Sequence, residues 1–231
     1  MPRVSAQHEH EVRERIVRAA TRVFSERGFH RATMQDIVRA SGLSVGAIYT
    51  YFKSKDELIL AGCDIITDQE MSELARRLTP VEGFRERLRV ATGFMFDQIE
   101  FEPGQLGSTR LIALAWAEAD TSPAIREMLL RRRREIHGVT VALIQEGMAR
   151  GEFPSWLEID AVAGGIGALL DGVILQSIEE GAGYRRSVSE RRVLSMIELL
   201  LAAASAGPPE RLDAVPPLPY SERLAPERVA S

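Results

Sequence analysis

The chain has 231 residues, of which 45% are hydrophobic and 6% aromatic, and its formal net charge is −4. This length exceeds one small domain and is short for three, so we expect two domains. The single cysteine, Cys63, excludes an intramolecular disulfide, fits a reducing compartment and is expected to be a small buried hydrophobe.

We expect a cytoplasmic protein with no membrane contact. Charged residues interrupt the apolar runs before they reach the length of a membrane span. The segment from His8 to Glu11 is polar where a signal peptide would be apolar.

Basic charge is mildly concentrated at the N-terminal end. Residues 1–60 carry a balance of +3, which leaves −7 for the rest of the chain. This asymmetry favours a nucleic-acid contact near the N-terminus. Only two of the 29 basic residues are lysines, Lys53 and Lys55, which suggests positions that need a compact charge, although chance placement remains the alternative.

The first predicted helix runs from Glu11 to Gly28, which acts as its C-cap, and the ten residues before it are expected to be frayed. Apolar residues recur in it at spacings of three and four, as one buried face requires. These residues are Val12, Ile16, Ala19, Val23 and Phe24.

Two short helices and a tight turn follow. Thr33 and Asp36 have the spacing of a capping box, which predicts a helix start. Gly42 is the natural turn residue because it adopts positive φ without steric cost, and Ser44 then caps a second helix that ends near Tyr51. This pattern is typical of a helix-turn-helix unit.

The second short helix has the chemistry of a DNA-reading element. Ile48 and Phe52, four residues apart, are expected in the core, while no acidic residue occurs between Leu43 and Lys55. Short side chains on the leading turn allow a helix backbone to approach base edges in the major groove. A glycine turn between two helices also occurs in many other all-α proteins, which is the alternative interpretation.

A longer helix is predicted from the capping box Ser54–Glu57 to Pro80.

The run Arg131 to Arg134 sweeps around the predicted helix 123–150 and is expected to be a solvated face, with a second nucleic-acid patch as the alternative. Six of the eleven prolines lie between residues 207 and 231, which predicts an extended tail. The later helices are predicted at residues 82–101, 106–118, 123–150, 159–181 and 188–204.

Enzyme and metal signatures are weak, so we expect no catalytic residue, no cofactor and no metal. Gly165 and Gly167 match part of a dinucleotide-binding loop, but Leu170 occupies the position of the third glycine and no strand precedes them. His8 and His10 lie in the frayed segment, and the other two histidines have no neighbour at ligand spacing.

The order T-x-x-x-I followed by G-L-S-x-G-x-I-Y-x-Y-F-K-S-K-x-x-L, from Thr33 to Leu58, resembles the DNA-binding domain of TetR-type bacterial regulators. The resemblance covers roughly the first 60 residues, and the remainder resembles the family only in length and helical layout. Two positions depart from the family pattern: Ser41 replaces the usual alanine, and Tyr51 replaces a frequent histidine. Neither change removes a residue type that contacts phosphate, but the histidine contact of the family is not carried over to Tyr51.

The resemblance implies an all-α fold with a three-helix helix-turn-helix domain at residues 1–53, a helical ligand-binding and dimerisation domain at 54–205, and a Pro-rich tail at 206–231. It implies a homodimer, a double-stranded DNA operator and a small-molecule effector. We expect a repressor on a palindromic operator with half-sites about 34 Å apart or slightly more, released by its effector. An activator, an enzyme fused to a regulatory head and an architectural DNA binder remain alternatives.

The candidate site residues fall into four groups. Base contacts are expected from Ser44, Val45, Ala47 and Thr50, with Gly46 beside them, and phosphate contacts from Thr33, Tyr49, Tyr51, Lys53 and Lys55. The small residues Gly164, Ala168 and Gly172, four apart, allow another helix to approach closely. The resemblance implies that they and Ile197 and Leu201 lie at a dimer interface of the last two helices, with packing inside the monomer as the alternative. Ligand contacts are expected from Phe96, Trp116, Met128, His137, Asp171 and Gln176, with a filled core and internal hydrogen bonds as the alternative.

Overall fold

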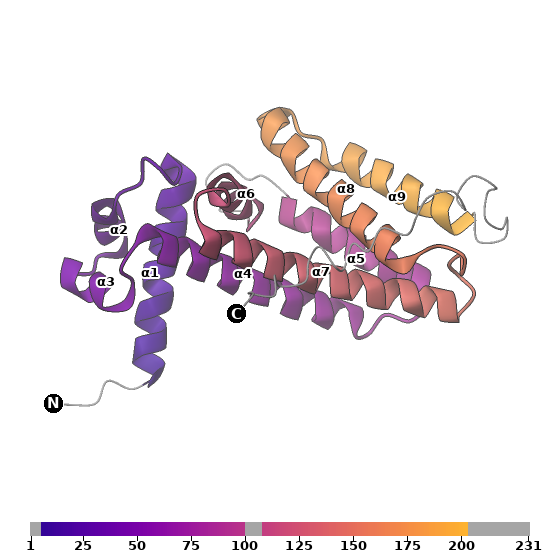
Figure 1. Ribbon diagram of the computed structural model, residues 1–231, viewed down its shortest axis with the longest axis horizontal. Helices are drawn as coiled ribbons and strands as arrows, with labels where there is room; N and C mark the ends of the chain where they lie inside the picture. The colour runs from indigo at the N-terminus through magenta and orange to yellow at the C-terminus, as the bar shows by residue number, and fades with distance from the viewer. Residues whose placement is uncertain (1–5, 100–107, 203–231) are drawn as a thin grey trace, which may run out of the picture. The chain divides into compact units, whose positions relative to one another are not determined.

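The computed structural model describes residues 6–99 and 108–202, and all its regular elements within these ranges are helical (Figure 1). The all-α prediction is therefore confirmed. The helices are α1 (Ala6–Arg27), α2 (Met34–Ser41), α3 (Val45–Tyr51), α4 (Lys55–Leu78), α5 (Phe84–Ile99), α6 (Ser108–Glu118), α7 (Pro123–Ala149), α8 (Ile159–Glu180) and α9 (Arg186–Ala202), with a short 3-10 turn at Gly181–Gly183.

One predicted helix boundary is wrong. Helix α1 begins at Ala6, five residues before the predicted start at Glu11. Its first turns are exposed all around and carry polar pairs four residues apart, including Gln7 with Glu11. Such a segment has no apolar periodicity to detect, although local pairs of this kind favour a helix.

The remaining boundaries agree with the predicted ones to within two residues wherever both ends are described. Predicted helix ends at residues 101, 106 and 204, and the Pro-rich tail at 206–231, lie outside the described residues.

The chain divides into two compact units. Among the described residues, the head unit comprises 6–71 and 108–129, and the body unit comprises 72–99 and 130–202. The helices α4 and α7 each contribute to both units. The head unit thus extends beyond the segment 1–53 expected from sequence.

A hydrophobic cluster of buried residues fills the described part of the head unit. Phe24 of α1, Ile48 of α3 and Phe52 are buried in it together with Leu111 of α6. Cys63 is also fully buried there, as expected. In Figure 1, α2 and α3 lie on one side of α1, and α4 crosses it. The shared core makes α6 part of the scaffold that supports the helix-turn-helix unit.

In the body unit, α5 and α9 run antiparallel and are joined by charged pairs. Arg186 at the start of α9 donates to Asp97 near the end of α5, and Arg85 near the start of α5 pairs with Glu198 at 2.9 Å. Asp97 also accepts a hydrogen bond from Arg77 of α4. One carboxylate therefore links three helices.

These arginines also lower carboxyl pKa values. Burial raises the pKa of Asp97, but the hydrogen bonds from Arg77 and Arg186 lower it by more than burial raises it. The pKa of Asp97 therefore lies below its ordinary value. Hydrogen bonds from Arg76 and Arg77 lower the pKa of Glu73 to about 2.

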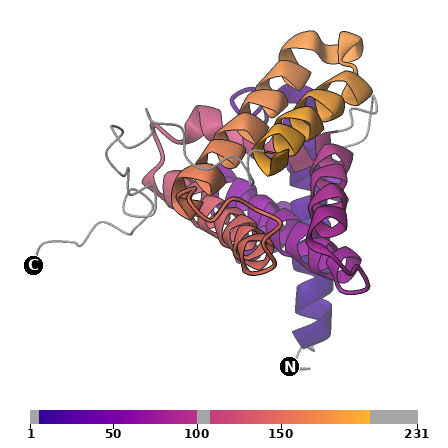
Figure 2. The same ribbon diagram turned by 90° about the vertical axis from the view of Figure 1, so that its right-hand side faces the viewer.

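Helix α8 differs from expectation in its hydropathy. The segment Ile159–Gly183 is long and apolar enough to cross a membrane by length and composition, so the prediction that no apolar run reaches the length of a membrane span is wrong there. One such helix is weak evidence for a membrane, because core helices of soluble proteins pass the same test. In Figures 1 and 2, α8 and α9 lie side by side, so this apolar helix packs beside another helix of the protein.

We expect acid to weaken the α4–α5–α9 link. Because the native pKa values of Asp97 and Glu73 lie below their unfolded values, the unfolded chain binds more protons in acid. The contribution of Glu73 within α4 is full near neutrality and is lost as the pH falls below about 4.5 toward about 2, and the contribution of Asp97 is likewise lost in acid. The melting temperature should change little between pH 7 and 5 and fall below that.

The matched test compares Asp97→Asn with Asp68→Asn, a change at an exposed position of α4. Asp97→Asn should lower the melting temperature at pH 7, and its difference from the unmodified chain should shrink in acid. Equal melting temperatures for the two variants at pH 7 would contradict a stabilising role of Asp97.

Candidate nucleic-acid interface

The N-terminus of α2 is fixed by hydrogen bonds around Asp36. The Asp36 carboxylate accepts from the Thr33 backbone N–H at 3.0 Å and from the Thr33 hydroxyl at 2.7 Å, and the Asp36 N–H donates back to that hydroxyl at 3.1 Å. The predicted capping box is confirmed. Arg27 donates to the same carboxylate at 2.9 Å, and Arg39 is a further donor. These hydrogen bonds, that of Thr33 above all, lower the pKa of Asp36 below its ordinary value.

The C-terminus of α2 is held by α1. Arg15 donates to the Ser41 carbonyl at 2.8 Å, and Arg22 donates to the Ala40 carbonyl at 3.1 Å. Cations at these carbonyls offset the negative end of the helix dipole. Gly42 then turns the chain with φ of +66°, as predicted, and a side chain there would also approach Arg15 closely.

Ser41, which stands where the family usually has alanine, forms hydrogen bonds within the turn. Its side chain is buried, donates to the Val38 carbonyl at 3.0 Å and accepts from the Leu43 N–H at 3.3 Å. The hydroxyl therefore adds a hydrogen bond across the turn that an alanine would lack.

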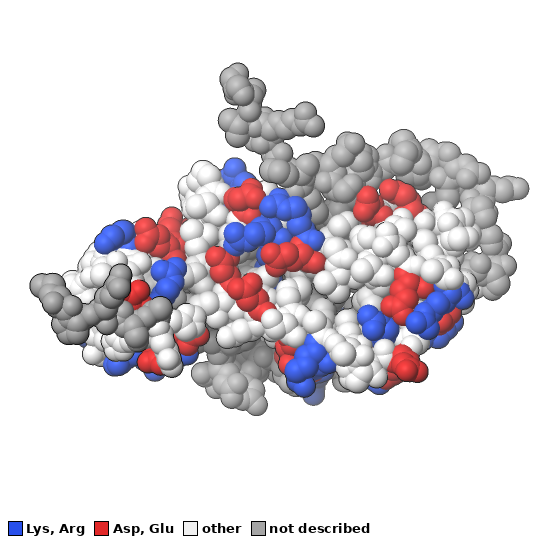
Figure 3. All heavy atoms as spheres, turned by 90° about the horizontal axis from the view of Figure 1, so that it is seen from below, with Lys and Arg blue, Asp and Glu red and all other residues white. Residues whose placement is uncertain are grey.

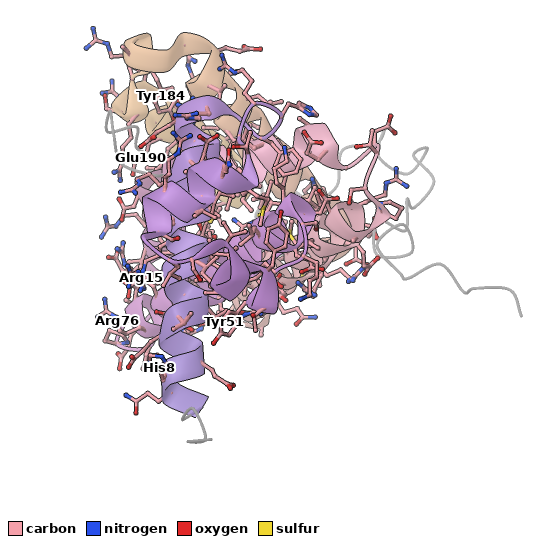
Figure 4. All side chains as sticks on the ribbon, turned by 90° about the vertical axis from the view of Figure 1, so that its left-hand side faces the viewer. His8, Arg15, Tyr51, Arg76, Tyr184 and Glu190 are labelled. Carbon is pink, nitrogen blue, oxygen red and sulfur yellow. The ribbon has the colours of Figure 1, made fainter. Side chains whose placement is uncertain are left out.

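Helix α3 separates a buried face from an exposed face. Ser44 caps it, accepting from the Ala47 N–H at 3.2 Å, and Ile48 is fully buried, both as predicted. Val45 is 52% exposed and Tyr49 is 40% exposed. Figure 4 views the head unit from the side of α2 and α3. The outward face consists of Ser44, Val45, Gly46, Tyr49 and Thr50, with Ala47 half-buried beside them.

The two lysines have different surroundings. Lys53 is exposed, and its ammonium donates to the Tyr49 carbonyl at the end of α3. The Lys55 ammonium donates to the Phe29 carbonyl at 2.8 Å and lies 4.6 Å from the centre of the Phe29 ring. Lys55 thus holds the loop between α1 and α2, while Lys53 remains at the surface beside α3.

Two of the three other expected phosphate contacts, Thr33 and Tyr51, are also engaged within the protein, whereas Tyr49 is exposed on α3. Thr33 is exposed, but its hydroxyl belongs to the capping box of α2. Tyr51 is half-buried and packs against the head core. Their contacts with DNA stay predictions.

Charge does not identify this surface by itself. In Figure 3, acidic and basic side chains are interspersed over the face shown. The arginines Arg15, Arg22 and Arg27 were not among the expected site residues, although they fix α2. Their partners lie 9 to 26 residues away in sequence, so local patterns do not reveal them.

The expected ligand contacts are divided between the two units. Met128 is buried in the head core, and Trp116 packs against it. In the body unit, Phe96 is fully buried and Gln176 is exposed. The structure therefore does not gather the six residues into one cluster.

The two remaining ligand candidates, both in the body unit, have charged partners. His137 Nε2 lies 3.1 Å from Asp160, and Asp171 accepts from Arg133 at 2.6 Å. Both side chains therefore make hydrogen bonds inside the protein, as the alternative interpretation expected. Among the described residues, no group of three or more His, Cys, Asp or Glu side chains has metal-binding geometry.

The expected dimer residues have mixed exposure. Gly164, Ile197 and Leu201 are buried within the body unit, Gly172 is half-buried and Ala168 is exposed. The larger apolar side chains exposed on α8 and α9 were not named from the sequence; in α8, a helix that is apolar on several faces does not reveal which face is covered. They are Leu175, Ile178, Val188, Met196 and Leu199.

Family models match both parts of the chain. The model of bacterial regulatory proteins of the tetR family matches residues 16–61, and the model of the BetI-type transcriptional repressor C-terminal domain matches residues 84–206. The HTH-type transcriptional regulator UidR of Escherichia coli is 32% identical over 141 residues, which cover 61% of this chain and 68% of UidR. The chain belongs to the TetR family of bacterial transcriptional regulators.

Further relatives agree with this assignment. The regulator TtgR of Pseudomonas putida is 27% identical over 180 residues, which cover 75% of this chain and 83% of TtgR. A TetR transcriptional regulator from Chloroflexus aurantiacus has a TM-score of 0.72 at 25% identity, covering 83% of this chain and 96% of the other. A regulator from Saccharomonospora viridis, crystallised with choline, has a TM-score of 0.73 at 24% identity, covering 82% and 96%.

As a member of the TetR family, the protein is a DNA-binding transcriptional regulator, and the family prediction is confirmed. The relatives named here are all transcriptional regulators. The roles of individual DNA-contacting residues stay predictions.

We expect Lys53 and Lys55 to differ in function. Lys53→Ala should weaken binding to all duplexes and lower the salt slope by about one unit, because it removes one predicted phosphate contact. Lys55→Ala should lower the free energy of unfolding by about 1–2 kcal/mol, because it removes a charged hydrogen bond and a ring contact. Thermal melts and titrations at several salt concentrations measure both effects. A lower salt slope with an unchanged melting temperature for Lys55→Ala would contradict this division.

Replacing Gly46 by alanine should stabilise the fold and weaken DNA binding. The φ of Gly46 is not positive, and a side chain added there would meet nothing within 4 Å inside the protein. Gly46→Ala should therefore stabilise the fold by roughly 0.5–1 kcal/mol. The added methyl group should weaken DNA binding if the groove approaches α3 closely. Stronger folding with unchanged DNA affinity would show that the α3 backbone does not contact DNA.

Proposed function

We propose that this protein is a cytoplasmic homodimeric repressor that binds a palindromic operator and is released by a small-molecule effector. The observation that supports this most directly is the outward face of α3. It presents small and hydroxyl-bearing side chains without any acid, on a helix that α1 and α2 hold in place. In this proposal α3 enters the major groove.

The dimer is supported by the apolar side chains exposed on α8 and α9. Leu199 is 72% exposed, and Leu175 and Met196 are each about half exposed. Exposed apolar side chains grouped on neighbouring helices are typical of a protein interface. A second copy would cover this face about a twofold axis, which also presents two α3 helices to a palindrome.

Repression and effector release are supported by the relatives. The C-terminal family model describes a repressor, and a regulator of the same fold was crystallised with choline. The activator FasR of Mycolicibacterium smegmatis is 37% identical over 92 residues, which cover 40% of this chain. We choose repression because the repressor model matches residues 84–206, the longer segment.

The proposed effector site lies in the body unit. Phe96 supplies a buried aromatic ring, while His137 and Asp171 supply polar groups on α7 and α8. His137 pairs with Asp160, and Asp171 pairs with Arg133. An effector that took the place of either partner would change the contacts between α7 and α8. DNA affinity then falls according to the effector's preference for the non-binding conformation.

The test begins with selection from a pool of random 40-base-pair duplexes by the full-length protein at ~150 mM salt, where non-specific binding is weak. We expect the retained duplexes to share a palindrome with half-sites about one helical turn apart or slightly more. Repression is tested by placing this palindrome at a promoter upstream of a reporter gene. Retained duplexes without a common sequence would favour an architectural DNA binder instead.

A charged residue at Ala168 should disrupt the dimer. Ala168→Glu places a carboxylate on the exposed face of α8, and Ala142→Glu makes the same change at an exposed position of α7. Sedimentation should give monomers for Ala168→Glu and dimers for Ala142→Glu, with weaker operator binding for the monomer. Dimers for both variants would place the interface elsewhere.

A further inference from the structure

The outward face of α3 lacks the side chains that usually identify bases by paired hydrogen bonds. Residues 44–52 contain no Arg, Lys, Asn, Gln, Asp or Glu. Arg and Lys identify guanine, Asn and Gln identify adenine, and Asp and Glu accept from cytosine. This face therefore needs another way to distinguish base pairs.

Its hydroxyl groups are partly committed inside the protein. The Ser44 oxygen accepts from the Ala47 N–H at 3.2 Å, and the Thr50 hydroxyl donates to the Gly46 carbonyl at 2.9 Å. Ser44 thus keeps one donor, and Thr50 keeps acceptor capacity. Single hydrogen bonds of this kind fit more than one base and give limited discrimination.

Val45 is the exposed apolar side chain at the start of this face. It is 52% exposed, whereas Ile48 on the same helix is fully buried. Gly46 beside it carries no side chain, so the helix can approach a groove closely at this point. In the major groove, the thymine 5-methyl group is the apolar group that such a side chain contacts.

We propose that Val45 reads the 5-methyl group of a thymine in each operator half-site, and that this contact is one source of sequence specificity. This inference rests on the proposed operator-binding function. Tyr49, which is exposed on the same face, would bind a phosphate and contribute affinity without sequence preference.

The test replaces each thymine of the selected operator, one position at a time, by deoxyuridine. This change removes the methyl group and leaves the base-pairing groups unchanged. Burial of one methyl group corresponds to roughly fourfold in affinity, so we expect a roughly fourfold loss at one position in a half-site. The loss should reach roughly fifteenfold when both half-sites are changed.

Two variants of the full-length protein assign the effect. With Val45→Ala, the difference between thymine and deoxyuridine at that position should disappear, because the side chain that contacts the methyl group has been shortened. Tyr49→Phe removes a hydroxyl from the same face, and it should weaken binding to both duplexes equally while keeping the difference. Thermal melts verify that both variants are folded.

The outcomes separate this inference from the proposed function. A common operator that tolerates deoxyuridine at every position would overturn the thymine contact and leave the function intact. An effect of deoxyuridine that persists in Val45→Ala would overturn the assignment to Val45. Selection that yields no common sequence would overturn both.

Discussion

The position of α3 depends on how firmly α2 is held, and arginines hold α2 at both ends. Arg27 and Arg39 bind Asp36 at its N-terminus, while Arg15 and Arg22 bind its last carbonyl groups. Three of these four arginines come from α1. Because the Gly42 turn is short, an α2 fixed at both ends leaves α3 little freedom. The same contacts explain why the helix-turn-helix unit needs α1 as a third helix.

The head core extends this constraint beyond the first three helices. Leu111 and Ala115 of α6 are buried together with residues of α1 and the start of α4. The helices α4 and α7 then continue from the head unit into the body unit. In the body, Asp97 links α4 to α5 and α9, so α4 is coupled to the helices at the proposed dimer face.

Local sequence patterns predicted the features that depend on neighbouring residues. The caps at Thr33 and Ser44 join residues three apart, and the turn at Gly42 depends on one backbone angle. Contacts between distant segments could not be predicted in this way. The hydrogen bond from Lys55 to the Phe29 carbonyl spans 26 residues, so no local pattern distinguishes the role of Lys55 from that of Lys53. The exposure of Leu175 was also hidden, because α8 is apolar on several faces.

The use of arginine in the head clarifies why its net charge is a poor guide to DNA recognition. Residues 1–60 contain eight arginines, yet Arg15, Arg22, Arg27 and Arg39 donate to groups of the protein itself. Their charge fixes the geometry of α2, while the outward face of α3 is uncharged. Phosphate contacts give affinity and strong salt dependence, whereas base contacts give specificity. A recognition helix without charge therefore separates affinity from specificity. Its specificity depends on shape and apolar contact, which are less sensitive to salt than phosphate binding.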